Sequence, residues 1–524
     1  MKTQNSSMAE HDFSKGKMWR IIVAQAVPLT IAQLVQLLYN IVDRVYIGHL
    51  PGVGSLALTG VGLTFPITTL ILAFANLFGT GGAPLFSIQR GAGNVERARE
   101  IMGNVFTMIL VTSVILMGFC YAFRVPILYL FGASDATIIY ADSYLKVYLL
   151  GVVFSMIVTG MNGFISALGF PRTAMWTTVI GAVLNLILDP IFIFGLSMGV
   201  QGAAAATVIS QCVSAIWVLH FLVTGQSRIK SAHSFRKKEH TEGPIPAASN
   251  SEGTKQTDTL ASKWKKTGED NPSVVLNRKE GGKTELNPKD SSVSEDVSNI
   301  CLGLSYMRVN GQIARNVLSL GVSGFMQQAT NCVVQIVCNV TLQNYGGDLY
   351  VGIMTIVNSI REIASLPVLG ISSGAQPVLG YNYGAKKPER VKQGIRFMAL
   401  LGVAYTAVMW LVIELFPGAF IRIFSSDAET IAFGIRAVRI YFFGFVFMSL
   451  QFMGQSTFVG LGKAKRAVFF SILRKIIIVV PLTLLLPMFM GLGTDGVFAA
   501  EPISNLVGGL ACFLTMYFTL YRKL

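Results

Sequence analysis

The sequence predicts an all-α membrane protein with twelve transmembrane helices in two pseudo-symmetric six-helix bundles. Its 524 residues are 52% hydrophobic and only 13% charged, whereas about a quarter of the residues of a soluble protein are charged. Apolar runs of about 20 residues alternate with short basic connectors, which is typical of polytopic helical membrane proteins. The two halves of the chain also repeat one another.

Each predicted helix is an apolar run long enough to cross a bilayer. In the first half these runs lie at 21–48, 56–80, 101–123, 143–168, 174–195 and 201–224. In the second half they lie at 315–343, 351–380, 394–416, 433–460, 465–490 and 496–521.

The runs divide the chain into an N-terminal tail (1–20), a first lobe (21–227), a linker (228–309) and a second lobe (310–524). The linker is rich in Lys, Glu, Ser, Asn and Gly and has few aromatic residues. We expect it to be disordered, because it cannot bury enough apolar surface to offset the entropy of ordering.

Basic residues predict the orientation. The connectors QRGAGNVERARE, GFPRTAMW, YNYGAKKPERVKQGIR and GLGKAKRA, the linker and the terminal YRKL carry most of the Lys and Arg. The alternate connectors carry almost none, so the positive-inside rule places both termini and the linker in the cytoplasm, with the helices in the plasma (inner) membrane. The net charge of +15 therefore reflects topology rather than nucleic-acid binding.

An internal repeat supports the two-bundle arrangement. The motif GGAP at 81–84 returns as GAQP at 374–377, so the repeat offset is 374 − 81 = 293. The same offset aligns GAGNVER at 91–97 with GAKKPER at 384–390. Six crossings return each repeat to the same side of the membrane, and transporters built in this way bind substrate between their halves near the midplane.

The segment GAVLNLILDPIFIFG, at 181–195, is apolar but carries Asn185 and Asp189. Their spacing of four residues places both side chains on one face of a helix. Pro190 has no N–H to donate to the carbonyl of Leu186, so we expect a kink there. Such polar groups in a membrane helix mark ion or substrate paths; the alternative is a structural pair that holds two helices together.

The first helix carries a polar stripe formed by Gln36, Asn40 and Asp43 at spacings i, i+4 and i+7, which we expect to face inward. Arg44 adjoins Asp43, so an alternative role for Asp43 is to neutralise a surface cation.

The second half has its own intramembrane charges, which are Arg361, Glu362, Glu414, Arg474, Lys475 and Glu501. Glu362 and Glu501 are secondary site candidates. Arg361 and Glu362 are adjacent and therefore point about 100° apart on a helix. Arg474 and Lys475 either contact substrate or serve the structure by snorkelling or locking helices together.

The segments PLTIAQLVQLLYNIVDRVYIGHLPG, NGFISALGFPRT and NLILDP, with the repeated Gly-Ala connectors, resemble the multidrug and toxic compound extrusion (MATE) transporters. The resemblance is greatest to their DinF-like branch, which includes MepA-type pumps, and it covers both halves but not the linker. It implies two six-helix lobes that export organic cations and amphipathic drugs in exchange for Na⁺ or H⁺. It assigns cation coupling to Tyr39, Asp43, Asn185, Asp189 and Thr207, with Asn162 as a further candidate.

The chemistry of this cluster agrees with the resemblance. Na⁺ prefers oxygen ligands, and Asp43, Asn185, Asp189 and Thr207 supply carboxylate, amide and hydroxyl oxygens. Two neighbouring carboxylates in a dry site are equally suited to sharing a proton. The sequence leaves Na⁺ and H⁺ open.

No P-loop, hydrolase triad or nucleotide-binding domain is recognisable in the sequence, so we predict a secondary transporter and not an enzyme. We expect no cofactor besides the coupling ion, and a monomer whose partners are a drug-like molecule and the bilayer, without nucleic acid. The alternatives are a lipid-linked oligosaccharide flippase of the same superfamily and a membrane receptor or scaffold that acts through the linker.

Overall fold

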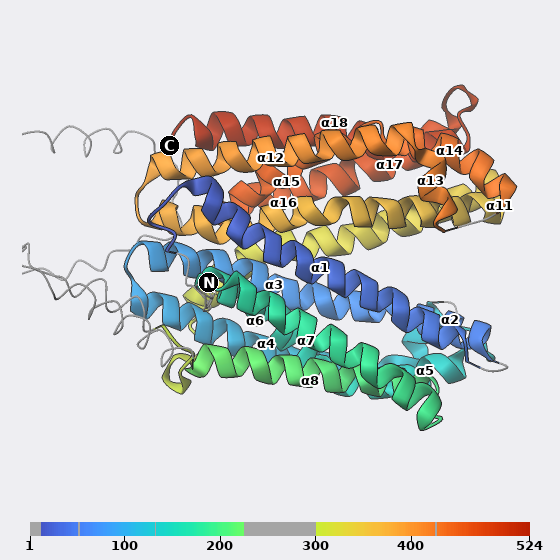
Figure 1. The fold of residues 1–524 in the computed structure, drawn as a ribbon, viewed down its shortest axis with the longest axis horizontal. Helices are drawn as coiled ribbons and strands as arrows, with labels where there is room; N and C mark the ends of the chain where they lie inside the picture. The colour runs from blue at the N-terminus through green and yellow to red at the C-terminus, as the bar shows by residue number, and fades with distance from the viewer. Residues whose placement is uncertain (1–11, 51–52, 132, 225–299, 425–426) are drawn as a thin grey trace, which may run out of the picture. The chain divides into compact units, whose positions relative to one another are not determined.

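The computed structural model describes residues 12–50, 53–131, 133–224, 300–424 and 427–524 (Figure 1). All regular elements in these ranges are helical, which confirms the predicted all-α class. The first-half elements are α1 (Met18–Gly48), α2 (Gly54–Leu63), α3 (Phe65–Gly91), α4 (Val95–Leu130), α5 (Ile138–Leu150), α6 (Val152–Ala167), α7 (Pro171–Pro190), η1 (Ile191–Gly195) and α8 (Val200–Thr224). The later elements are η4 (Leu304–Tyr306), α11 (Gly311–Gly384), α12 (Pro388–Leu415), α13 (Pro417–Arg422), α14 (Ala428–Phe442), α15 (Phe445–Gly460), α16 (Ala464–Ile472), η5 (Leu473–Val479), α17 (Val480–Leu485), η6 (Leu486–Gly491), α18 (Thr494–Met516) and η7 (Tyr517–Tyr521).

The described helices include nine that are long and apolar enough to cross a membrane. Two bent pairs pass the same test, α5 with α6 at 57° and α14 with α15 at 42°. The predicted segment 315–343 is helical as well. It forms the first part of α11, which continues to a break at Gly347, where φ is +65°. This part is less apolar than the other spans because Gln and Asn recur along it.

Several helices extend beyond their predicted ends. α3 continues past 80 to Gly91, with Pro84 inside it, and α4 begins at Val95 rather than at 101. The connector between them is therefore confined to 92–94. The prediction stopped too early because it treated Gly-Pro and charged residues as loop signals, whereas packed membrane helices tolerate both near their ends.

The two halves share one backbone pattern at the predicted offset. The end of α3 at 91 corresponds to the end of α11 at 384, and the start of α4 at 95 corresponds to the start of α12 at 388. Gly93 and Lys386, in the connectors that follow, both have positive φ, at 79° and 54°. Gly169 and Gly462 match in the same way, with φ of 101° and 72°. The repeat is therefore structural as well as a sequence repeat.

The halves meet where α3 crosses α11. A Cβ atom on Gly91 would overlap the carbonyl oxygen of Tyr381, and one on Gly384 would overlap the carbonyl oxygen of Ile88. The two contacts are reciprocal, because Ile88 and Tyr381 correspond to one another in the same repeat. Such reciprocity is expected at the interface of a two-fold related pair, and it requires glycine at both positions.

Before α1, Phe13 lies inside the predicted tail and is only 1% exposed. Its ring packs edge-on against Tyr381 at 5.7 Å, and the guanidinium of Arg90 lies 5.7 Å from its centroid. Its carbonyl accepts hydrogen bonds from Asn382 Nδ2 and Arg390 Nη2, both at 3.1 Å. The chain is therefore anchored to both halves before α1 begins.

α1 contacts both lobes. Met18, Ile22 and Ala26, near its beginning, belong to the hydrophobic core that α11, α12 and α15 form in the second lobe. The helix also packs along α7 of the first lobe. In Figure 1, α1 runs between the blue-to-green helices and the yellow-to-red helices. It therefore links the second-lobe core with the neighbourhood of Asn185 and Asp189.

The last residues of the predicted linker pack on the first lobe. Leu302 N donates to the carbonyl of Leu222 at 2.9 Å, and Thr107 Oγ1 donates to the carbonyl of Met307 at 2.8 Å. The buried side chain of Leu302 gives this end an apolar anchor. The rest of the predicted linker, 228–299, lies outside the described residues.

Candidate functional site

Asn185 and Asp189 lie on one face of α7, as their spacing predicts. They are 2% and 1% exposed, and Asn185 Nδ2 donates to Asp189 Oδ1 at 3.1 Å. The Oδ1 atom of Asn185 is buried and has no hydrogen-bond partner among the described residues. The pair therefore presents one oxygen that the surrounding protein leaves unsatisfied.

Thr207, on α8, adds a hydroxyl group beside Asn185 and Asp189. Its Oγ1 lies 3.4 Å from Asn185 Nδ2 and donates to the carbonyl of Ala203 at 3.0 Å. α7 and α8 thus meet through side chains that are 22 residues apart in sequence. The structure brings together the amide, carboxylate and hydroxyl that the sequence analysis grouped.

Pro190 does not break the helix. The chain continues as a π-helical turn over Ile191–Gly195, in which Leu196 N donates to the carbonyl of Ile191 at 2.8 Å. The expected kink thus takes the form of a widened turn, because proline cannot supply its N–H and the following residues rearrange their hydrogen bonds. Such turns are frequent at functional sites, and this one directly follows the helix that carries Asp189.

Asp43 approaches this group from α1. Its charge interacts with that of Asp189, and its Oδ1 atom is buried without a hydrogen-bond partner among the described residues. The guanidinium of Arg44 lies over the ring of Phe65, 5.3 Å from its centroid. No ion pair joins Asp43 to Arg44 among the described residues, although the charge of Arg44 still acts on Asp43.

The other predicted site residues of α1 differ in their solvent exposure. Tyr39 interacts electrostatically with Asp43 and Asp189, and its hydroxyl is hydrogen-bonded to Gln36. Gln36 and Asn40 themselves are exposed, whereas Tyr39 and Asp43 are only partly exposed. The less exposed part of this polar face is therefore formed by Tyr39 and Asp43.

Two tyrosines of α5 adjoin the cluster, and the sequence analysis did not identify them. Tyr144 and Tyr148 are buried and stacked, with centroids 5.8 Å apart and an interplanar angle of 16°. Both interact electrostatically with Tyr39, and Tyr144 also interacts with Asp43. Their i, i+4 spacing placed them on one face, but only the packing of α5 shows which helix that face meets.

Three secondary candidates lie apart from this cluster. Asn162 Nδ2 donates to the carbonyl of Ala174 at 3.0 Å and so joins α6 to the beginning of α7. Ala174 is eleven positions before Asn185, which is about 16 Å along a helix. Glu362 is exposed on α11, and Glu501 belongs to a separate group in the second lobe.

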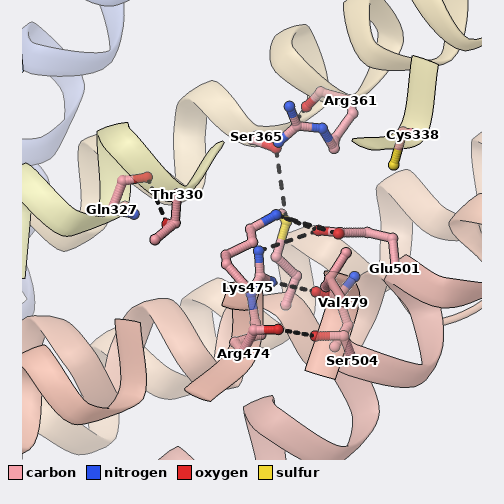
Figure 2. A network of polar contacts seen from close by, with 12 residues as sticks. Gln327, Thr330, Cys338, Arg361, Ser365, Arg474, Lys475, Val479, Glu501 and Ser504 are labelled. Carbon is pink, nitrogen blue, oxygen red and sulfur yellow. Dashed lines mark hydrogen bonds and ion pairs between the residues drawn. The ribbon is translucent and has the colours of Figure 1, made fainter. Parts of the chain in front are cut away.

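Glu501 lies among basic side chains (Figure 2). Its Oε1 accepts from Lys475 Nζ at 2.9 Å and from Arg474 Nη2 at 3.2 Å. This second-lobe group therefore differs from the cluster of Asp43 and Asp189, because basic side chains outnumber its carboxylate.

The first part of α11 carries four carboxamide side chains on one face, which the sequence analysis overlooked. Gln327, Asn331, Gln335 and Asn339 follow one another at intervals of four residues. Each remains partly or fully exposed in the structure. Amides on a membrane helix normally face a polar cavity rather than lipid. The sequence signal for them is the i, i+4 repeat itself.

No three His, Cys, Asp or Glu side chains of the described residues are placed together to hold a metal ion. The first-lobe cluster has a different donor set, consisting of two carboxylates, an amide and a hydroxyl. Oxygen donors of this kind are suited to Na⁺ or to a shared proton rather than to a transition metal.

Comparison with known proteins places the chain in a family. The family model MatE matches two segments, 28–191 and 325–485, one in each half. The chain belongs to the MatE family. Its first matched segment contains Tyr39, Asp43, Asn185 and Asp189, and the second contains Arg361, Arg474 and Lys475. Members of the MATE family are transporters, so this chain is a multi-pass membrane transporter and not an enzyme.

Relatives of this MATE protein cover almost its whole length. The Multidrug export protein MepA of Staphylococcus saprophyticus is 22% identical over 96% of this chain and 95% of its own. MepA of Staphylococcus aureus strain MSSA476 is 21% identical, with the same coverage. A solved outward-facing structure of a multidrug resistance MATE family transporter superposes with a TM-score of 0.79, at 21% identity, over 99% of both chains. The predicted family, its MepA-like branch and the MATE fold are thereby confirmed.

Proposed function

We propose that this MATE-family transporter exports amphipathic drug-like molecules, organic cations among them, in exchange for H⁺ or Na⁺ by alternating access. Support for the cargo comes from relatives named as multidrug export proteins, which align over 96% of the chain. Support for the coupling comes from the cluster on α1, α7 and α8.

The observation that carries the coupling proposal is that the carboxylates of Asp43 and Asp189 form no ion pair among the described residues of the first lobe. Asp189 is buried and receives its hydrogen bond from a neutral amide. Asp43 has a buried carboxylate oxygen without a partner among the described residues. The first-lobe ion pairs of the described chain involve the acidic residues Glu96, Glu100 and Asp142 instead.

An ionised carboxylate in a membrane interior is costly unless a cation or a proton compensates it. Arg44, which follows Asp43 in α1, is the cation that acts on this carboxylate, and it forms no ion pair with it among the described residues. A cation or proton from solution would supply the remaining compensation. One Na⁺ held by the two carboxylates, the amide oxygen and the hydroxyl would satisfy the cluster. One proton shared by Asp43 and Asp189 would do so too.

α1 connects the cation site of the first lobe with the core of the second lobe. Cation binding can therefore favour one arrangement of the two lobes over the other. Asp43 lies in the part of α1 beside the cluster, whereas Met18 and Ile22 are embedded in the second-lobe core. A cation that draws Asp43 towards Asp189 therefore pulls on a helix whose beginning is fixed to the other lobe. A ligand shifts a conformational equilibrium by its differential affinity for the two states, and α1 connects this affinity with the lobe contact.

We place this transporter in the cell membrane with both termini and the linker in the cytoplasm. The distribution of Lys and Arg among the connectors supports this orientation.

The substitution Asp189→Asn tests the proposal. It keeps the size of the side chain and removes one charge in a low-dielectric site, where charge matters far more than in water. We expect export driven by an ion gradient to collapse while the protein still reaches the membrane, because neutralising an intramembrane carboxylate relieves a desolvation cost. The assay is dye efflux from vesicles under an imposed Na⁺ or H⁺ gradient, one at a time. The gradient that drives efflux in the wild type identifies the ion.

Asp43→Asn should behave like Asp189→Asn, and the double variant should be little worse than either, since both carboxylates serve one ion. Glu414→Gln is the control, because this carboxylate lines a surface groove of the second lobe with Trp410 and Arg439. It should leave gradient-driven efflux intact. Normal gradient-driven efflux in Asp189→Asn would refute the proposed coupling site.

A further inference from the structure

The surface groove of the second lobe lies apart from the proposed cation site. It lies between α12, α18 and the bend at which α14 ends and α15 begins, and its volume is about 620 Å³. Volumes in this range are typical of small-molecule sites. In Figure 1, α12 and α18 lie on the side of the second lobe away from the first-lobe helices. Phe443, in the wall of the groove, is 73% exposed, so the groove opens on the outside of the bundle, where the bilayer lies.

The groove arises from the way α15 packs against α18. A Cβ atom on Gly444 would overlap the carbonyl oxygen of Pro502, so the two helices are in close contact at this point. α14 diverges from this contact, because it makes an angle of 42° with α15. The space between α14 and α18 is lined mainly by apolar side chains, among them Phe443, Phe447 and Ile503.

Two opposite charges also line the groove. Glu414 lies in the last turn of α12, and Arg439 lies on α14. The charge of Arg439 acts on Glu414, and the indole of Trp410 lies beside the carboxylate. The second-lobe ion pairs of the described chain nevertheless join other residues. Glu414 Oε1 is buried without a hydrogen-bond partner among the described residues. Both charges therefore keep the capacity to bind a group of opposite sign.

The charged end of the groove lies near the membrane surface, and the apolar end lies deeper. Asp495, in the first turn of α18, is paired with Arg436 of α14 at 2.5 Å, which marks the level at which both helices reach the surface. Arg439 lies about one turn further along α14. Leu506 lines the groove at a position eleven residues beyond Asp495, which is about 16 Å along α18. The groove therefore has the polarity of a lipid molecule, with charge near the surface and an apolar part towards the middle of the bilayer.

We propose that this groove binds a phospholipid whose headgroup carries a primary amine, as phosphatidylethanolamine does, from the surrounding leaflet. Arg439 contacts the phosphate, since a guanidinium can hold phosphate oxygens through two parallel N–H donors. Glu414 accepts hydrogen bonds from the ammonium group, and one acyl chain lies against Phe443 and Phe447. The inference goes beyond the proposed export function and does not depend on it.

The pair of charges selects among lipid headgroups. A phosphatidylglycerol headgroup matches Arg439 but brings no positive group to Glu414. A choline headgroup is positive but has no N–H, so it cannot donate a hydrogen bond to the carboxylate. Hydrogen bonds between charged groups are about twice as strong as neutral ones, and charges interact more strongly where the surroundings are apolar. Among these three headgroups, the primary amine is the one that satisfies both residues.

Fluorescence quenching by brominated lipids tests the inference. The purified full-length protein in nonionic detergent micelles is titrated with phosphatidylethanolamine, phosphatidylcholine or phosphatidylglycerol whose acyl chains carry bromine, which quenches a tryptophan on contact. Trp410 lines the groove, and its signal is the difference between the wild type and Trp410→Phe. Trp176, on α7 of the first lobe, is 48% exposed. Its signal, obtained with Trp176→Phe, is the reference for a lipid-facing tryptophan outside the groove.

We expect brominated phosphatidylethanolamine to quench Trp410 with the lowest apparent Kd, expressed as a mole fraction in the micelle. This Kd should be about fivefold below those of the other two lipids, as for one net hydrogen bond. The three lipids should quench Trp176 alike. Equal quenching of Trp410 by all three, or a preference for phosphatidylcholine or phosphatidylglycerol, would overturn the inference.

Three variants assign the preference to particular residues. Glu414→Gln should raise the Kd of phosphatidylethanolamine to that of phosphatidylcholine, and the Kd of phosphatidylcholine should stay within about twofold. Arg439→Gln should raise both Kd values, because both lipids contain the phosphate. Glu429→Gln removes an exposed carboxylate from the first turn of α14 and should change neither. A preference for phosphatidylethanolamine that survives in Glu414→Gln would contradict recognition of the amine by this carboxylate.

If Glu414→Gln fails to fold, the wild type alone still decides, through its comparison of the three lipids. Failure of the proposed function is recognised separately, because the quenching experiment contains no ion gradient. Normal gradient-driven efflux in Asp189→Asn would refute the cation site, and it would leave the lipid preference of the purified protein unaffected.

Discussion

The ion pairs of Glu501 provide a quantitative test of how the second lobe is held together. Glu501→Gln keeps the length of the side chain but replaces a carboxylate that accepts three hydrogen bonds from charged donors, at 2.9 to 3.2 Å. Both donor residues, Arg474 and Lys475, are buried and would lose their only ion-pair partner in the described chain. Removing one partner of a buried pair costs about 3–5 kcal/mol, because it leaves an uncompensated buried charge.

We expect Glu501→Gln to lower the Tm of the protein in detergent by roughly 5 °C. A thiol-reactive dye can follow unfolding, since Cys338 and Cys512 are buried in the second lobe and become reactive only when it opens. Lys475→Met removes a cation instead of the carboxylate and should be the milder change, because Glu501 keeps its bond from Arg474.

The double variant Glu501→Gln with Lys475→Met shows whether the destabilisation comes from the loss of the ion pair or from a general loss of packing. Residues in direct contact couple by about 0.5–3 kcal/mol, so the double variant should be more stable than the sum of the single effects predicts. Unfolding of Glu501→Gln within about 1 °C of the wild type would refute the reasoning, since it would mean that water already screens the two cations.

Two further outcomes follow from the lobe contact and the linker. Gly384→Ala should lower stability by about 1–3 kcal/mol in thermal unfolding, because its Cβ would overlap the carbonyl oxygen of Ile88, whereas Gly118→Ala, with nothing within 4 Å, should not. An equally stable Gly384→Ala would mean that α3 and α11 do not approach as closely as the structure shows. Deletion of 235–299 should leave dye efflux under an ion gradient unchanged, because the proposed sites lie on helices of the two lobes. Loss of efflux with normal membrane insertion would favour the alternative in which the protein acts through its linker.

Local patterns in the sequence predicted the helices, the repeat and the Asn185–Asp189 pair. The rise and turn of a helix are constant, so a spacing of four residues fixes a shared face without knowledge of the neighbours. The repeat offset, found first in short motifs, also relates the helix ends and the positive-φ residues of the two halves. The resemblance to MATE transporters added Thr207, whose distance of 22 residues from Asn185 carries no local signal.

The tertiary structure alone decided which faces meet. The sequence shows Tyr144 and Tyr148 on one face of α5, but only the packing of α5 brings them to Asp43 and Tyr39. Phe13 lies in what the sequence predicted as a tail, and its burial depends on Tyr381, which belongs to the other half of the chain.

The same holds for the charges of the second lobe. From the sequence, Arg361, Arg474, Lys475 and Glu501 are four intramembrane charges without assigned partners. The structure pairs Glu501 with Arg474 and Lys475 and leaves Arg361 without an ion pair. The physical reason is that hydropathy and helical period depend on neighbours along the chain, whereas charge compensation in a membrane depends on distances between helices. Those distances are set by how whole helices pack.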